Sequence, residues 1–183
     1  MFDREDGRDP LMDFFREVVH ESLTQKLGMK DEDVEAYMSA MLAKFLHEDG
    51  IFGIRDAAGN RVESVAEMIA EGDIRLNANT FDREREVHQH IGDFLLFWSG
   101  VFPEFLLQIK APSSRDAMLD VVEQGKYSYG VAGSFDYGPY EEQSQTLRKL
   151  SSNFVEYQLA LRMVRGSFLG FANSSDWSEG FRA

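Results

Sequence analysis

Residues 81–108 contain the feature that most constrains how this chain folds. The segment begins as a charged stretch and becomes apolar on every side at Phe94 to Trp98. A helix that is apolar all round must be enclosed by other elements or by lipid. The uncharged run is too short to cross a bilayer, which needs roughly 20 apolar residues. The sequence therefore predicts a buried central helix over about residues 81–99, closed by Gly100.

Helical periodicity recurs along the rest of the chain, with capping residues where the predicted helices begin. Asp9 and Pro10 are typical of a first helical turn, and Ser114 is a candidate N-cap for a later helix. A chain of 183 residues is long enough for one domain with a substantial core. We predict a single all-α domain, a bundle of six to seven helices around the central one. The other long predicted helices cover about residues 10–27, 31–46, 61–71 and 140–165.

The last of these predicted helices carries the most regular pattern in the sequence. Its apolar residues alternate at spacings of three and four, which is the pattern of helices that pack lengthwise. The pattern fits packing within one bundle or a two-fold contact between copies, and we predict a homodimer. The predicted interaction surface, called the 147–164 seam below, consists of Leu147, Leu150, Phe154, Tyr157, Leu161 and Val164. Gly166 is predicted to end this helix, and residues 167–183 to form a partly ordered tail.

The formal net charge of −13 disfavours one class of partner. An acidic surface repels phosphate backbones, so we predict no nucleic-acid binding, and solubility is the simplest role for the charge. The chain has no cysteine, which excludes disulfides, thiolate metal sites and cysteine nucleophiles. Its first ten residues are charged and lack an apolar stretch. We therefore expect no secretory signal, no membrane partner and a cytoplasmic location.

Glu86, His90 and Asp93 are the best candidates for a chemical site. Spacings of four and three place them on one face of a helix, whereas His88 points about 200° away from His90. A carboxylate–imidazole–carboxylate row is able to hold a divalent metal with help from another helix, or to tune a histidine base. The alternative that we favour is a hydrogen-bonded network at the edge of the apolar run. We therefore predict no metal, no cofactor and no catalytic residue.

A cluster of tyrosines follows in the sequence and offers a second set of candidate residues. These side chains either line a pocket beside the candidate site or keep their hydroxyl groups at the helix surface, the alternative that we favour. The cluster consists of Tyr127, Tyr129, Tyr137 and Tyr140. The glycines from Gly125 to Gly133 lack the Gly-Lys-Ser/Thr ending of a phosphate loop, so they indicate close helix packing.

One series of residues in the middle of the chain has a recognisable order. It consists of His90 to Phe97, Gly100, Phe102-Pro103-Glu104, and later Gly125 with Tyr129. The series resembles a set of uncharacterised bacterial proteins in which a G-D/E-x-x-L-F-x-x-G-x-F-P-E segment precedes a helix with Gly and Tyr. The resemblance covers about residues 83–133 and implies a helical domain of bacterial origin. No established activity is associated with these proteins, so the resemblance assigns no catalytic residue.

The sequence contains no complete set of catalytic residues. This absence favours a non-enzymatic protein over an enzyme. We predict a non-enzymatic protein that acts as a protein-interaction or regulatory module and associates with itself or with another protein. The alternative is a domain that binds a small molecule or a divalent metal, with or without enzymatic activity, centred on Glu86, His90 and Asp93.

Overall fold

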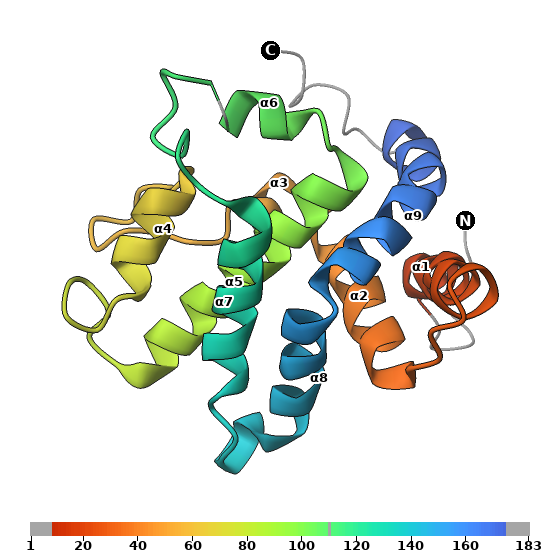
Figure 1. Cartoon of the computed structure of the whole chain (residues 1–183), viewed down its shortest axis with the longest axis horizontal. Helices are drawn as coiled ribbons and strands as arrows, with labels where there is room; N and C mark the ends of the chain where they lie inside the picture. The colour runs from red at the N-terminus through yellow and green to blue at the C-terminus, as the bar shows by residue number, and fades with distance from the viewer. Residues whose placement is uncertain (1–8, 110, 175–183) are drawn as a thin grey trace.

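The structure, a computed structural model, describes residues 9–109 and 111–174. Within these ranges the regular structure is helical, apart from one isolated antiparallel bridge between Arg55 and Arg61. Figure 1 shows the helices gathered around one long helix that crosses the middle of the molecule. The predicted all-α class is confirmed.

Nine α-helices lie in the described ranges, against the six to seven predicted. Two of them, α3 and α6, are only four and five residues long, and the helix predicted over residues 140–165 is divided in two. A π-helical turn, η1 (Glu21–Lys26), extends α1, and a 3-10 turn, η2 (Gly138–Tyr140), precedes α8. The α-helices are α1 (Pro10–His20), α2 (Glu32–Lys44), α3 (Glu48–Ile51), α4 (Val65–Gly72), α5 (Phe81–Val101), α6 (Phe105–Ile109), α7 (Val121–Gly133), α8 (Glu141–Ser152) and α9 (Phe154–Ser174).

The central element is α5. Every residue from His90 to Val101 is buried, and α5 packs most extensively against α7, α9 and α4. The predicted buried helix is therefore confirmed, and its apolar circumference is enclosed by other helices, as the pattern requires. None of the described helices combines the length and the hydropathy of a membrane span.

Most of the longer helices begin after a residue whose side chain caps the first turn. The cap residues accept a backbone N–H hydrogen bond in the first turn: they are Asp9, Asp31, Ser64, Thr80 and Asp120. The predicted N-cap Ser114 is wrong, because α7 begins seven residues later, after Asp120. The hydroxyl of Ser114 instead accepts the N–H of Asp116. Asp116 in turn accepts the N–H groups of Val65 and Ala66, both at 2.9 Å, and so ties this segment to the start of α4.

Gly100 lies inside α5 and does not end it. A Cβ atom at this position would lie 2.6 Å from Cβ of Leu161, so glycine lets α5 and α9 cross closely. The helix ends one residue later, at Val101. Phe102 leaves the helical conformation because the residue before a proline, here Pro103, is disfavoured in it.

Asn153 divides the helix that was predicted over residues 140–165. Its backbone departs from helical geometry, and its side-chain amide donates to the carbonyl of Lys149 at 3.3 Å. The division lets α8 pack on α7 while α9 packs on α5, two directions that one straight helix cannot follow. Gly166 does not end α9, which continues to Ser174, and the rest of the predicted tail lies outside the described residues.

The 147–164 seam lies inside the core of a single copy. All six of its residues are at most 2% exposed: Leu147, Leu150, Phe154, Tyr157, Leu161 and Val164. Packing within one bundle is thus what this spacing encodes, one of the two alternatives that the sequence left open. These side chains are consequently not available as a surface for a second copy.

Candidate functional site

The three residues of the predicted site do not meet. Glu86 is exposed, and its carboxylate pairs with Arg83 at 3.1 Å. His90 and Asp93 are both buried, His90 beside aromatic rings and Asp93 beside tyrosine hydroxyl groups. Among the described residues, no three His, Asp or Glu side chains gather in a way that would hold a metal ion.

His90 lies in an aromatic enclosure beneath the loop that follows α3. Its ring centroid is 6.0 Å from that of Phe45 and 6.3 Å from that of Phe94. Burial lowers the pKa of His90 to about 4, and the positive charge of Lys44 acts in the same direction. The imidazole is therefore neutral at pH 7. His88 faces the other side of α5, with Nδ1 3.3 Å from Oγ of Ser128, as helical periodicity predicts.

Asp93 is a carboxyl group buried in the core, and it forms no ion pair with any described residue. Tyr37 of α2 and Tyr129 of α7 both donate their hydroxyl hydrogens to its Oδ1 atom, at 2.8 and 2.9 Å. Burial nevertheless raises the pKa of Asp93 to about 6, because the charge of Lys44 and the two tyrosine donors compensate incompletely for lost hydration. The same enclosure raises the pKa of each tyrosine well above its ordinary value. Asp93 thus fastens α2 and α7 to α5.

Gly92 explains how Tyr129 reaches Asp93. A Cβ atom at this position would lie only 2.7 Å from the ring of Tyr129. With glycine there, the ring lies directly on the backbone of α5, and its hydroxyl reaches the neighbouring carboxylate. The Gly-Asp pair in the sequence is therefore one structural unit, in which glycine provides the space and aspartate the acceptor.

A chain of hydrogen bonds runs outward from Asp93 to the surface. Gln89 donates its amide hydrogen to the hydroxyl of Tyr37 at 3.0 Å, and its carbonyl oxygen accepts from Nη1 of Arg85 at 3.1 Å. Arg85 also donates from Nη2 to the amide oxygen of Gln143 at 2.5 Å. Every donor from Arg85 to Tyr37 points toward Asp93. The positive end of the chain lies outward and the negative end lies in the core.

Arg85 is a buried cation that is paired with neutral groups only. The residue is 7% exposed, it makes no ion pair with any described residue, and its Nε atom has no partner among them. Its guanidinium lies over the ring of Tyr140 at 4.2 Å, a cation–π contact, and the Tyr140 hydroxyl is held by Asp82 at 2.7 Å. A buried charge without a counter-charge is costly and marks a functional candidate.

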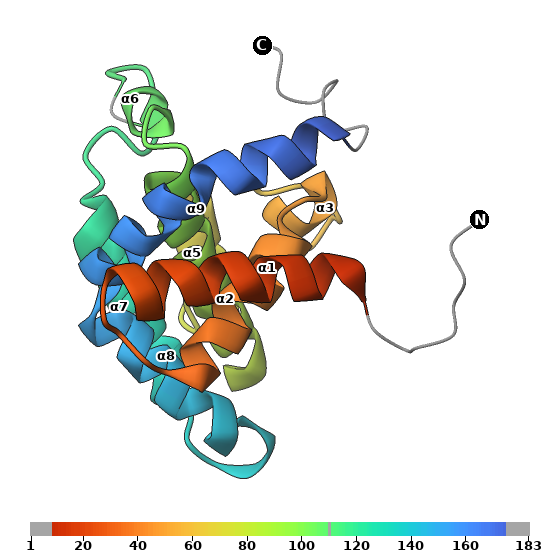
Figure 2. The same cartoon turned by 90° about the vertical axis from the view of Figure 1, so that its right-hand side faces the viewer.

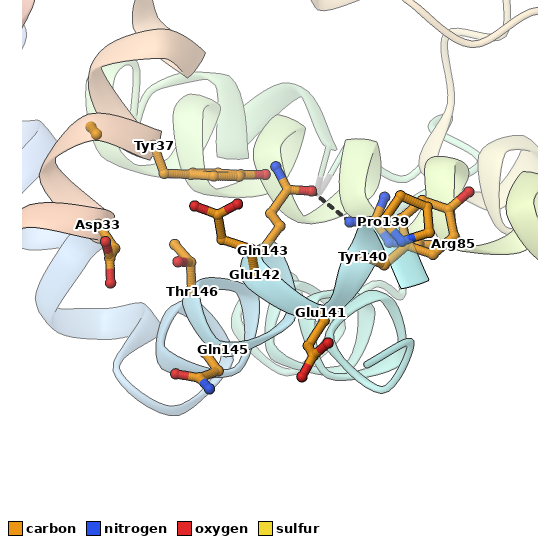
Figure 3. A pocket seen from close by; sticks show the side chains of 11 residues that line it. Asp33, Tyr37, Arg85, Pro139, Tyr140, Glu141, Glu142, Gln143, Gln145 and Thr146 are labelled. Carbon is orange, nitrogen blue, oxygen red and sulfur yellow. Dashed lines mark hydrogen bonds between the residues drawn. The ribbon is translucent and has the colours of Figure 1, made fainter. Parts of the chain in front are cut away.

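Arg85 lies against an open pocket between α2, α5 and the start of α8. The pocket has a volume of about 740 Å³. Figure 3 shows Arg85 and Tyr140 at one end, Asp33 at the other, and Glu142 and Gln143 between them in this view. The full lining consists of Asp33, Ala36, Tyr37, Arg85, Pro139, Tyr140, Glu141, Glu142, Gln143, Gln145 and Thr146.

Of the four candidate tyrosines, the structure brings two to this region. Tyr140 lines the pocket and Tyr129 is the buried partner of Asp93. Tyr127 is 62% exposed and lies beside His88. Tyr137 is 54% exposed and is not part of the pocket lining, but its ring centroid is 6.1 Å from that of Tyr140. Arg85 is not among the site residues predicted from the sequence, because an arginine within a charged helical start is ordinarily solvated. Arg85, Gln89 and Asp93 follow one another at spacings of four residues. Residues at that spacing share one helix face, so this pattern was the sequence signal that pointed to Arg85.

Comparison of the chain with protein-family models, with curated proteins and with solved structures finds no match.

Proposed function

We propose that this protein binds a small organic acid in the pocket between α2, α5 and α8, with the guanidinium of Arg85 receiving the carboxylate. The single observation that carries the proposal is a buried guanidinium with neutral partners at the edge of a pocket. Arginine matches a carboxylate with parallel N–H donors, and charge-assisted bonds of this kind are the strong ones.

The neighbours of Arg85 hold the guanidinium in place before a ligand arrives. Gln89 and Gln143 each accept one N–H group, and the ring of Tyr140 covers one face. Two of the five N–H donors of the guanidinium are thereby used and the Nε–H is buried, which leaves one hydrogen on each Nη atom for a carboxylate. Preorganisation of this kind lowers the entropic cost of binding.

Isothermal titration calorimetry with acetate, propionate, butyrate and succinate tests the proposal. We expect at least one of them to bind the wild-type protein, and Arg85→Gln to weaken that binding by about 10- to 100-fold, the loss of one charge-assisted contact. Arg75→Gln is the matched control, because Arg75 is 85% exposed and distant from the lining, yet its loss changes the net charge equally.

Far-UV circular dichroism verifies that each variant is folded. Binding that is equal in wild type and in Arg85→Gln would remove Arg85 from the proposal. Absence of heat and of any melting shift with all four acids would reject carboxylate binding at this pocket.

A second candidate function is self-association through the outer face of α9. Val155, Leu159 and Met163 recur every four residues on one face and are 48%, 43% and 38% exposed. Glu156 and Arg162 are exposed on the two sides of this stripe and pair with no described residue. We infer that a second copy is the occupant: a parallel two-fold pairing of α9 sets Glu156 of each copy beside Arg162 of the other, as in coiled coils.

Light scattering coupled to size-exclusion chromatography tests this second function. We expect a dimer for the wild type and a monomer for Leu159→Glu, because the substitution places two like charges at the two-fold axis. Exchanging the charges, with Glu156→Arg and Arg162→Glu together, is expected to preserve the dimer, whereas Glu156→Arg alone weakens it. A wild-type protein that remains a monomer at all concentrations would exclude this pairing.

A further inference from the structure

The pocket beside Arg85 carries charges of both signs that remain unpaired. Glu141 and Glu142 line it, are exposed, and form no ion pair with any described residue. The third acid of the lining, Asp33, differs because Lys149 lies 3.6 Å from its carboxylate. Arg85 therefore shares the pocket with two carboxylates that have no cation of their own.

The unpaired charges do not neutralise one another, because each is fixed by its own element. Arg85 is held on α5 between Gln89, Gln143 and the ring of Tyr140. Glu141 and Glu142 form the first turn of α8, where the helix dipole favours acids. The dipole accounts for two acids at this position, and both remain exposed in the pocket lining without a cation among the described residues.

A purely anionic ligand meets a mixed environment in this pocket. Its carboxylate is attracted by Arg85 and repelled by Glu141 and Glu142, and multiply charged anions are repelled most strongly. A ligand that also carries an ammonium group replaces this repulsion with a second attraction. Electrostatic complementarity thus selects among organic acids those with a positive end.

We propose that the ligand is a small amino carboxylate, a zwitterion whose carboxylate binds Arg85 and whose ammonium group binds the acids at the start of α8. This inference rests on the proposed function and specifies its ligand class. The ligand lies along the pocket between Tyr140 and Glu142, two lining residues that are labelled in Figure 3.

Calorimetric titration with matched probes tests this inference. Glycine, β-alanine and γ-aminobutyrate supply both groups at increasing separation, acetate, propionate and butyrate supply the carboxylate alone, and the corresponding alkylamines supply the ammonium alone. We expect the best amino carboxylate to bind about tenfold or more tightly than its carboxylate analogue. We expect the double variant Glu141→Gln with Glu142→Gln to abolish that difference while leaving affinity for the simple carboxylate undiminished.

Glu123→Gln on α7 is the control for charge, since Glu123 is exposed and lies outside the pocket. Equal affinity for amino and simple carboxylates, or a preference that survives the double variant, overturns the zwitterion inference and leaves the proposed function standing. Binding of alkylamines alone, indifferent to Arg85→Gln, overturns both. Failure of every probe to bind also rejects the proposed function itself.

Discussion

At Asp93 the fold surrounds a carboxyl group with apolar side chains and supplies two tyrosine hydroxyls in place of a cation. Burial raises its pKa to about 6. Three residues earlier on α5, burial lowers the pKa of His90 to about 4. Because unfolding restores the ordinary pKa of each group, both shifts make the free energy of unfolding depend on pH.

The two shifts act in opposite directions across one pH range. The raised pKa of Asp93 favours the folded state below 3.8, and this stability is lost as the pH rises through about 6. The lowered pKa of His90 favours the folded state above 6.5, and this stability is lost as the pH falls through about 4. Each pKa shift corresponds to about 3 kcal/mol in the free energy of unfolding. Because the two contributions change in opposite directions, they largely cancel between about pH 4 and about pH 6.

Asp93→Asn is expected to remove the pH dependence of stability that comes from Asp93 and to leave that of His90. Asparagine keeps an oxygen that accepts from Tyr37 and Tyr129 but carries no charge. Relative to wild type, the variant is expected to gain about 3 kcal/mol in free energy of unfolding as the pH rises from about 4 to about 7. Urea unfolding across that range measures the difference. Asp13→Asn, at an exposed carboxyl, is the control, and equal slopes for wild type and Asp93→Asn would contradict the assignment.

Gly125→Ala tests close packing at a single position in α7. A Cβ atom there would lie 2.4 Å from the ring of the buried residue Phe154, so we expect a loss of about 1 to 3 kcal/mol from overpacking. Gly130→Ala, five residues later, meets only Oγ of Ser151 at 3.4 Å. The control is expected to be neutral or to gain up to about 1 kcal/mol from alanine's helix propensity. Denaturant unfolding compares them, and equal effects would refute close approach at Gly125.

Among the elements, α9 presents two faces with different roles. The inner face, which includes Leu161 and Val164, packs against α5 and belongs to the core. The outer face, with Leu159 between Val155 and Met163, is partly exposed, and Figure 2 shows α9 running above α1 on the side that faces the viewer. Asn153 makes this arrangement possible, because the helix changes direction there and leaves α8 to cover α7.

Leu161→Ala and Leu159→Ala distinguish the two faces with the same chemical change. Leu161 is fully buried against Gly100, so its truncation is expected to cost about 2 to 5 kcal/mol. Leu159 is 43% exposed, and its truncation is expected to cost less than about 1 kcal/mol. Guanidinium unfolding at a protein concentration where light scattering shows a monomer measures both, so that pairing of α9 between copies does not contribute. A larger loss for Leu159 would mean that the outer face, and not the inner one, is packed in the folded protein.

The whole molecule combines one continuous apolar core with a strongly acidic total charge. The net charge of −13 is spread over all parts of the chain, and mutual repulsion of surface acids opposes compaction. Against this background the pocket concentrates one buried guanidinium among acids, using residues from α2, α5, η2 and α8.

Screening of the acidic surface is expected to stabilise the folded chain. Raising sodium chloride from about 0.01 to about 0.15 M shortens the screening length from about 30 to about 8 Å, so the melting temperature should rise. Calorimetric melting at constant pH measures the change. Sucrose at the same osmolality is the control for non-ionic effects, and a melting temperature that falls with salt would show that attractive surface pairs dominate.

Local sequence was sufficient to predict the all-α class, the burial of Phe94 to Trp98 and several helix starts, including those at Asp9 and Asp31. These features depend on residues three or four apart, and such spacing is visible in any single stretch of chain. The same rule predicted a continuous helix across Asn153 and a helix end at Gly100, both wrong. Each error concerns a residue whose conformation is decided by a neighbouring helix.

The sequence by itself determined that this chain buries one helix on all sides, because a helix with an apolar circumference must be enclosed and this apolar run is too short to span a bilayer. It also predicted that Asp93 would lie at the edge of the apolar run and need partners. Only the tertiary structure decided which partners these are, since Tyr37 and Tyr129 lie 56 and 36 residues away along the chain. The pairing of Arg85 with Gln143 spans 58 residues. No local periodicity specifies such contacts, because they depend on how helices cross after the core has formed.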